Sequence, residues 1–430
     1  MGQASRLSGL FEEHKRGRLC NDTMQDIHIE REYKFIPPTR GSFVINCILK
    51  TNFFAWHMRK SEGVVNGEVR NADRLRASLD AGHSIMLTPN HCRTADPIAM
   101  GWLMKEAKCL AYGMASWHLF NQGWFNRWAL RALGAFSVNR EGIDRQAINV
   151  AVDILESGER PLLIFPEGST TRTNDRLHAL LDGVAFIART AAKKRAKRNA
   201  SKVVIHPVAV KYFFEGDLRK AVDPVLTDIE HRLTWQPQND LPLMERIKKL
   251  GMALLSLKEL EYFGGPQVGS LHERLKKLID RILQPLEIHW LGQPQQGGVV
   301  PRVKAIRMKI MPDMIRGELS QTERDLRWRH LADIYLAQQV SCYPPDYLDE
   351  RPSGDRMLET VERFDEDLFD QARIHGHLKA VIDVGEAIEV DPKRDKSAKV
   401  DPLMAQLETQ LQGMLDELAL ESPLYEEQAG

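Results

Sequence analysis

The fold class expected for this chain is set by the stretch Ser84-Ile-Met-Leu-Thr-Pro-Asn-His-Cys-Arg-Thr-Ala-Asp-Pro97. Residues 84–88 form a short apolar run, which is typical of a strand buried on both faces. A segment with helical spacing begins at Asp96, so His91 and Asp96 fall at a strand-to-helix junction. Sheets of α/β proteins place their binding clefts at such carboxyl ends of strands.

The alternation of strand and helix continues on both sides of this stretch. Further strands are expected at 136–138, 162–165 and 203–213, and helices at 71–80, 96–108, 143–155 and 177–191. We therefore predict an α/β fold for residues 70 to 213, with a mostly parallel twisted sheet flanked by helices.

The pattern becomes mainly helical after residue 215. Ser270 with Glu273, and Ser320 with Glu323, have the spacing of capping boxes at helix starts. Alternation typical of a strand returns at 378–384, and a last helix is expected from Asp401. No internal repeat is recognised. The predicted organisation is an N-terminal arm (1–40), a motif-bearing α/β domain (41–215), a large helical insertion (216–375), a return to the α/β domain (376–420) and a tail (421–430).

Composition excludes several classes of protein. The chain has 430 residues, enough for a domain with a large insertion, and its formal net charge of zero gives no support to a nucleic-acid partner. Its five cysteines form no Cys-x-x-Cys pair, which argues against a disulfide framework or a zinc ribbon. We see no signal peptide or membrane-spanning run, and expect a cytoplasmic protein that would meet lipids peripherally, at the inner face of a membrane.

His91 and Asp96 are the first candidates for chemistry. A tight turn can bring the carboxyl group of Asp96 onto one imidazole nitrogen, which leaves the other nitrogen as a base. Because no Gly-x-Ser-x-Gly motif is present, the base would act directly on a substrate hydroxyl. Two alternatives stay open at this point: Asp96 as a simple helix cap, and Cys92 as a covalent nucleophile.

Two further motifs also follow short apolar runs. Gly134-Ala-Phe-Ser-Val-Asn-Arg140 places an arginine where it could bind a phosphate, or form a surface ion pair with Glu141 or Asp144. Phe165-Pro-Glu-Gly-Ser-Thr-Thr-Arg172 combines a sharp turn, an acid, hydroxyl donors and a second cation. Glu167 could bind an acceptor hydroxyl or hold the loop, and the alternative is a plain turn with a solvated acid.

A fourth segment, Val203-Val-Ile-His-Pro-Val-Ala-Val210, is an apolar strand interrupted by His206-Pro207. Proline inside a strand requires an edge position or a special role at a cleft.

The four segments in this order resemble the glycerolipid acyltransferase family, which comprises the 1-acylglycerol-3-phosphate and glycerol-3-phosphate acyltransferases. The resemblance covers roughly residues 70–213 and extends to the closing strand at 382–390, but not to residues 216–375. It implies that His91 is the general base and that Asp96 orients it.

The resemblance also implies how the substrates are bound. Arg140 would bind the acceptor phosphate, and the third motif would bind the acceptor through Glu167, Gly168, Ser169, Thr170 and Arg172. Family members often carry arginine where this chain has Thr170, which leaves open whether Arg172 takes over that role.

The reaction implied is transfer of a fatty acyl group in phospholipid biosynthesis. The donor would be acyl-CoA or acyl carrier protein, and the acceptor lysophosphatidate or glycerol 3-phosphate, with no metal or other cofactor. The alternatives are another lysolipid or lipid-linked acceptor, a non-catalytic binding protein that retains the fold, and a hydrolase.

Two segments bear on a membrane partner. A basic cluster at 193–198 could face anionic lipid or simply be a solvated helix end. An aromatic stretch between the first two motifs suits a membrane interface, an acyl tunnel or plain core; its members are Trp117, Phe120, Trp124, Phe125 and Trp128.

Overall fold

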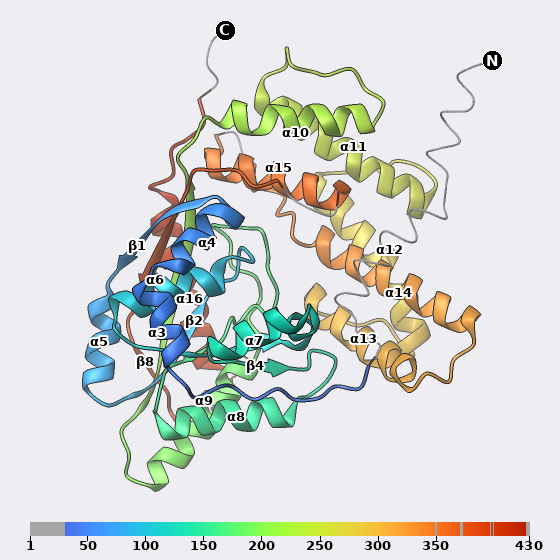
Figure 1. Ribbon diagram of the computed structural model, residues 1–430. Coiled ribbons are helices and arrows are strands. Elements are labelled where there is room, and N and C mark those ends of the chain that lie inside the picture. Colours follow the sequence, from blue (N-terminus) through green and yellow to red (C-terminus); the bar gives the residue numbers. More distant parts are fainter. Residues whose placement is uncertain (1–30, 349–350, 370–372, 396, 399, 427–430) are drawn as a thin grey trace, which may run out of the picture.

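The computed structural model describes residues 31–348, 351–369, 373–395, 397–398 and 400–426. Its centre is one sheet with the strand order β1-β7-β6-β2-β5-β3-β4, and β8 pairs with β6. Helices cover both faces of this sheet, and a further group of helices extends to one side of it (Figure 1). The strands are β1 (Val64–Arg70), β2 (Ser84–Pro89), β3 (Tyr112–Ser116), β4 (Ala135–Val138), β5 (Leu162–Leu163), β6 (Val203–Phe214), β7 (Leu378–Val384) and β8 (Ile388–Glu389).

Five neighbouring strands, from β6 through β2, β5 and β3 to β4, are parallel. β7 runs antiparallel to β6, and β1 pairs with β7 in parallel. The predicted fold class, a mostly parallel sheet flanked by helices, is therefore confirmed. Because β7 lies between β1 and β6, the chain that follows the helical region forms part of the same sheet as the motif-bearing strands.

The two faces of β2 illustrate why the sheet is buried on both sides. All six residues of the strand are buried. Ile85 and Leu87 pack into one hydrophobic cluster, and Met86 packs into the other. The helices around the sheet are α3 (Phe43–Lys50), α4 (Phe53–Glu62), α5 (Ala72–Asp80), α6 (Asp96–Glu106), the 3-10 turn η2 (Trp117–Asn121), α7 (Trp124–Ala132), α8 (Arg145–Ser157), α9 (Gly183–Lys197) and α16 (Pro402–Ala419).

One predicted helix begins later than its apolar spacing suggests. The spacing predicts a helix from residue 177, but α9 begins at Gly183. The preceding segment folds back over the turn after β5 instead: the His178 N–H donates to Glu167, and the Leu181 N–H donates to the Pro166 carbonyl. Those backbone groups are therefore unavailable for helical hydrogen bonds.

Pro207 lies in a central strand, so the edge position, one of the two alternatives given by the sequence, is excluded. β6 pairs with β8 at residues 204–205 and with β7 at residues 208–214. The Pro207 carbonyl accepts a hydrogen bond from the Gly385 N–H at 2.7 Å. The N–H that proline lacks would point to that same side, where one partner strand ends and the other begins, so no ladder bond is lost.

The N-terminal arm can be followed only in part, because residues 1–30 lie outside the described residues. Close to residue 36 the chain lies against the edge strand β4. The Ile36 N–H donates to Ser137 Oγ at 2.8 Å, and the Ser137 N–H donates to the Ile36 carbonyl at 3.0 Å. This part of the arm is therefore docked on the sheet. The predicted tail also lies outside the description at 427–430.

The helical region begins directly after β6. Its helices are α10 (Leu218–Arg232), α11 (Leu243–Phe263), α12 (Leu271–Leu291), α13 (Val299–Arg316), α14 (Gln321–Val340) and α15 (Gly354–Phe369). Ser270 and Glu273 form the predicted capping box at the start of α12. At the start of α14, the Ser320 hydroxyl accepts the Glu323 N–H at 3.2 Å.

An internal repeat, which the sequence analysis did not recognise, joins α10 to α13. Near the end of each of three helices a buried glutamate binds a buried arginine at the start of the next helix, and we call each such pair an Arg–Glu clamp. The clamps are Glu230–Arg246, Glu259–Arg274 and Glu287–Arg302. Each glutamate also accepts the backbone N–H of the glutamine in a Pro-Gln loop, namely Gln238, Gln267 or Gln295.

The clamps have a common geometry. Arg274 donates from Nε and from Nη2 to the two carboxylate oxygens of Glu259, both at 2.7 Å. Both side chains are almost completely buried. A two-point contact of this kind fixes the angle between successive helices, because the guanidinium fork accepts only one orientation of the carboxylate.

We expect Glu259→Gln to lower the free energy of unfolding by about 3–5 kcal/mol, because it leaves the Arg274 charge buried without its partner. Urea denaturation followed by circular dichroism measures the change. The exposed pair Lys258–Glu261 on the same helix supplies the control, and Glu261→Gln should cost less than about 1 kcal/mol. Replacing Glu259 and Arg274 together by leucine and methionine should recover most of the loss. Equal stability of Glu259→Gln and the wild type would contradict the prediction.

Candidate active site

Three of the four motifs meet at one edge of the sheet. His91 follows β2, Arg140 follows β4 and Glu167 follows β5. These strands are parallel members of one sheet, so their carboxyl ends point to the same edge. The sheet topology therefore brings together residues that lie far apart in the sequence. His91 and Glu167, for example, are 76 residues apart and are joined by a hydrogen bond.

The predicted contact between His91 and Asp96 is present. His91 Nδ1 lies 2.8 Å from Asp96 Oδ2, and the imidazole stacks on Phe165 with ring centroids 4.2 Å apart. Asp96 is fully buried, whereas 16% of the His91 side chain is exposed. Because the carboxylate accepts the proton on Nδ1, the Nε2 atom is left as the potential base.

Asp96 does not cap α6, although a cap was one of the two interpretations of this residue. It is the first residue of the helix, and its carboxyl group is turned to other partners. Oδ2 also accepts the Arg93 N–H at 2.9 Å, and Oδ1 accepts the Tyr212 hydroxyl at 2.7 Å. Donors on several sides fix the carboxylate, and it in turn fixes the imidazole.

Tyr212 was not identified from the sequence, and its position depends on two asparagines. The side-chain amide of Asn90 bonds to both backbone groups of Val210, at 2.7 and 2.9 Å. The amide of Asn174 bonds likewise to both backbone groups of Tyr212, at 2.6 and 2.8 Å. The two amides therefore continue the ladder of β6 beyond Pro89, the last residue of β2 that pairs with it.

Cys92 is unsuited to act as a nucleophile. The thiol is fully buried, and burial raises its pKa well above the ordinary value. Its sulfur lies 3.8 Å from Asp96 Oδ1 and from Asn174 Oδ1. A reactive cysteine needs an exposed thiolate with a lowered pKa, and Cys92 has the opposite environment.

Glu167 connects the turn after β5 to the loop that carries His91. Its Oε1 accepts the backbone N–H of His91 at 2.6 Å, and Oε2 accepts the N–H of His178 at 2.9 Å. The side chain is almost completely buried, and this burial raises its pKa to about 7, although both backbone donors oppose the shift. Glu167 therefore holds the loops together, which was one of its two predicted roles.

The rest of the third motif crosses the His91 loop. Gly168 has a φ of +72°, which favours glycine at this turn. The N–H groups of Thr171 and Arg172 donate to the carbonyls of His91 and Cys92 at 2.9 and 3.0 Å. Within the described residues, the hydroxyls of Ser169 and Thr170 have no hydrogen-bond partner and remain available to a substrate; both residues are partly exposed.

Arg172 is bound by the helical region. Its guanidinium donates to both carboxylate oxygens of Glu366 on α15, at 3.0 and 3.1 Å. On the same helix, Glu362 accepts from Arg93 at 2.6 Å, and Arg363 donates to the Arg172 carbonyl. Arg172, the cation predicted to bind substrate, is therefore already paired. Helix α15 contacts the loops of both the first and the third motif.

Arg140 lies in the turn after β4, and it bonds to the third motif. Its Nη2 donates to the Gly168 carbonyl at 2.5 Å. Burial and the nearby charge of Arg307 lower the pKa of Arg140 to about 10. Of the two carboxylates proposed from the sequence, Glu141 interacts electrostatically with this guanidinium, whereas Asp144 accepts the backbone N–H of Ala147 at 2.9 Å.

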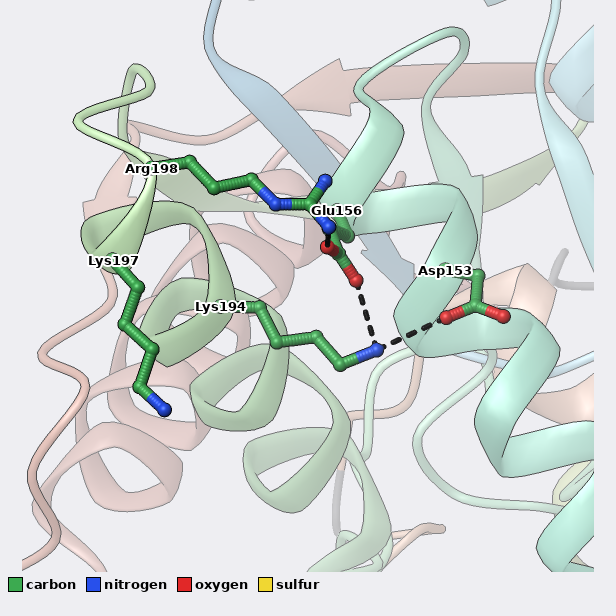
Figure 2. A pocket seen from close by; sticks show the side chains of 5 residues that line it. All are labelled: Asp153, Glu156, Lys194, Lys197 and Arg198. Carbon is green, nitrogen blue, oxygen red and sulfur yellow. Dashed lines mark hydrogen bonds and ion pairs between the residues drawn. The ribbon is translucent and has the colours of Figure 1, made fainter.

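Two cations of the basic cluster at 193–198, Lys194 and Arg198, are paired with acids of α8. Figure 2 shows Lys194 beside two acids of α8, at 3.1 Å from Asp153 Oδ1 and 2.8 Å from Glu156 Oε2. Arg198 pairs with the other oxygen of Glu156 at 2.7 Å. For Lys194 and Arg198, these pairs favour the interpretation as an ordinary helix end over a lipid-binding patch.

The free energy of unfolding of the wild-type protein should fall, relative to that of Glu167→Gln, as the pH rises. The unfolded group has an ordinary pKa of 4.5 and the folded one about 7. The native state therefore binds more protons between these values, and its stability falls as the pH rises through this window. At about 1.4 kcal/mol per pKa unit, the stability of the wild type relative to Glu167→Gln should fall by about 3 kcal/mol. Urea denaturation across the window tests this; a constant difference would refute the raised pKa.

Comparison with known proteins agrees with this geometry. A family model described as "Acyltransferase" matches residues 66–211. The 1-acyl-sn-glycerol-3-phosphate acyltransferase of Streptococcus pneumoniae (strain ATCC BAA-255 / R6) is 29% identical over 126 residues. That match covers 29% of this chain and 44% of the relative, so the chain spans less than half of the relative's length. The matched region contains His91, Arg140 and Glu167, so this part of the chain is similar to acyltransferases that act on glycerolipids.

Proposed function

We propose that this protein is an O-acyltransferase that moves a fatty acyl group from a thioester donor to a hydroxyl of a glycerol-phosphate lipid precursor. The observation that carries the proposal is the 2.8 Å contact between His91 and a fully buried Asp96 at the edge of the sheet. A histidine held in this way has one nitrogen free for proton transfer. The intact pair favours catalysis over a binding protein that merely retains the fold.

The reaction follows from the position of the base. His91 Nε2 removes the proton of the acceptor hydroxyl as the oxygen attacks the thioester carbonyl. The tetrahedral intermediate then expels the thiolate, which receives the same proton from the imidazolium. Asp96 stabilises the imidazolium between these two steps. The burial of Cys92 supports a direct transfer without a covalent acyl-enzyme.

The acceptor and donor are proposed by analogy with the relative. Its name specifies 1-acyl-sn-glycerol 3-phosphate as acceptor, and we propose lysophosphatidate or glycerol 3-phosphate for this chain. We propose acyl-CoA or acyl carrier protein as donor. Arg140 beside Gly168 supports a phosphate-bearing acceptor over a hydrolytic reaction, because water would need no cation there. Ser169 and Thr170 supply further donors.

We also propose that the protein acts at a membrane surface. Among the described residues, no helix has both the length and the apolar character to cross a bilayer. Of the aromatic stretch found in the sequence, Phe120 is buried, whereas Trp124, Phe125 and Trp128 on α7 are 81%, 59% and 50% exposed. A short helix that exposes aromatic side chains beside arginines suits the headgroup region of a membrane.

A graded series of variants tests the catalytic assignment. His91→Ala should lower kcat by about a hundred- to ten-thousand-fold, the usual contribution of a general base. Asp96→Asn should have a comparable effect, because it presents the wrong donor to Nδ1. Tyr212→Phe removes one hydrogen bond to Asp96 and should lower kcat by about tenfold. Labelled acyl-CoA with a panel of acceptors provides the assay, and the exposed His272→Ala is the matched control. Equal product from His91→Ala and the wild type would exclude the mechanism.

Flotation with liposomes tests the membrane proposal. Serine at Trp124, Phe125 and Trp128 should reduce the bound fraction severalfold, because the apolar area available to the headgroup region is lost. The control is a triple serine variant at Leu257, Leu260 and Val268, which are equally exposed side chains of the helical region. A similar loss in both variants, or in neither, would count against α7 as the docking element.

A further inference from the structure

The acceptor side of the site contains cations that come from the helical region. Glu141, which follows Arg140 directly, has its Oε2 atom 2.6 Å from Nε of Arg307 on α13. Lys304 lies one helical turn before Arg307. Burial lowers the pKa of Lys304, and the charges of Arg307 and Arg140 lower it further. Three positive charges from two distant parts of the chain therefore lie close together.

The charges in this group do not balance. Glu141 is the carboxylate that interacts with all three cations. In the part of the chain that the structure describes, Lys304 has neither an ion pair nor a hydrogen bond. Lys194 on α9 differs from Lys304, since it pairs with both Asp153 and Glu156 (Figure 2). Half-buried cations that repel one another lower the stability of the free protein, and such an arrangement is typical of a site that binds an anion.

The group also adjoins the catalytic pair. Arg140 donates to the carbonyl of Gly168, and the preceding residue, Glu167, accepts the backbone N–H of His91. One hydrogen bond and one peptide unit therefore separate the cations from the loop that holds the base. A phosphate bound by the cations would hold the rest of its molecule near His91.

We propose that Arg140, Lys304 and Arg307 form one binding site for the phosphate monoester of the acceptor, so that α13 is part of the substrate site. This inference rests on the proposed function and deepens it. Arg307 and Arg140 offer planar forks to the phosphate oxygens, and Lys304 adds a point charge. A dianion balances the excess of two positive charges left by Glu141. The phosphates of the donor are the other source of the same chemistry, and the test separates the two.

Direct binding to the full-length protein is the first measurement. Titration calorimetry with glycerol 3-phosphate should show a dissociation constant at least about tenfold higher for Lys304→Gln and Arg307→Gln, the usual scale for losing a charged contact. Lys309→Gln, an exposed position on the same helix, should bind like the wild type. Arg307→Lys should recover only part of the affinity, because the fork is lost. Unchanged affinity in both glutamine variants would overturn the proposal.

Stability provides a second readout that a structural role would not give. Without ligand, Lys304→Gln should melt at the same or a higher temperature than the wild type, because repulsion is relieved. With glycerol 3-phosphate, the order should reverse. A lower melting temperature of Lys304→Gln without ligand would assign Lys304 to structure and overturn the proposal.

Kinetics identify which substrate carries the phosphate. The KM for lysophosphatidate should rise about tenfold in Lys304→Gln, whereas the KM for acyl-CoA and the rate with a phosphate-free monoacylglycerol should not change. A higher KM for acyl-CoA alone would assign the cations to the donor and overturn the proposal. Should no acceptor be acylated while glycerol 3-phosphate binding still depends on Lys304, the proposed function fails and the phosphate site stands.

Discussion

The carboxyl group of Asp96 is the contact on which the rest of the site depends. It is fully buried, and its donors come from the His91 ring, the Arg93 backbone and the Tyr212 hydroxyl. A buried acceptor of this kind is costly unless every lone pair is used, so the loop after β2, the start of α6 and the end of β6 are held in one arrangement. Asn174 extends this arrangement, because its amide replaces a strand neighbour for the backbone of Tyr212.

The helical region is closely integrated with the sheet. α15 supplies acids to Arg93 and Arg172 and donates to the backbone of the third motif, while α13 reaches the turn after β4 through Arg307. Both helices contact the loops that carry the sequence motifs and not only the outer surface of the sheet. The shape of the site around Arg140 and Arg172 therefore depends on residues 216–375, for which the family resemblance makes no statement.

The positions of the motifs at strand ends could be predicted from the sequence because each motif is a short continuous segment. A buried apolar run followed at once by reactive residues identifies the strand end, and parallel pairing then brings the strand ends together. Tyr212 was missed because its partner, Asp96, is 116 residues away and a tyrosine in a strand has no local signature. The predicted start of α9 at residue 177 was wrong because apolar spacing does not show that the His178 N–H is already bound by the carboxylate of Glu167. The clamps were missed because the pattern that their units share, a glutamate followed by a Pro-Gln pair and then by an arginine 15 or 16 residues after the glutamate, is sparse and lies among dissimilar residues.

The Arg–Glu clamps make the helical region modular. Successive clamp glutamates, Glu230, Glu259 and Glu287, are 29 and 28 residues apart, so each unit is one helix with its loop. Arrays of this kind can gain or lose whole units, because each unit contacts mainly its neighbours. The number of helix-and-loop units between β6 and α13 determines which helix lies beside Arg140. In a protein built this way, a change in the length of the array would place a different helix beside the turn after β4 while every residue of the sheet stayed the same.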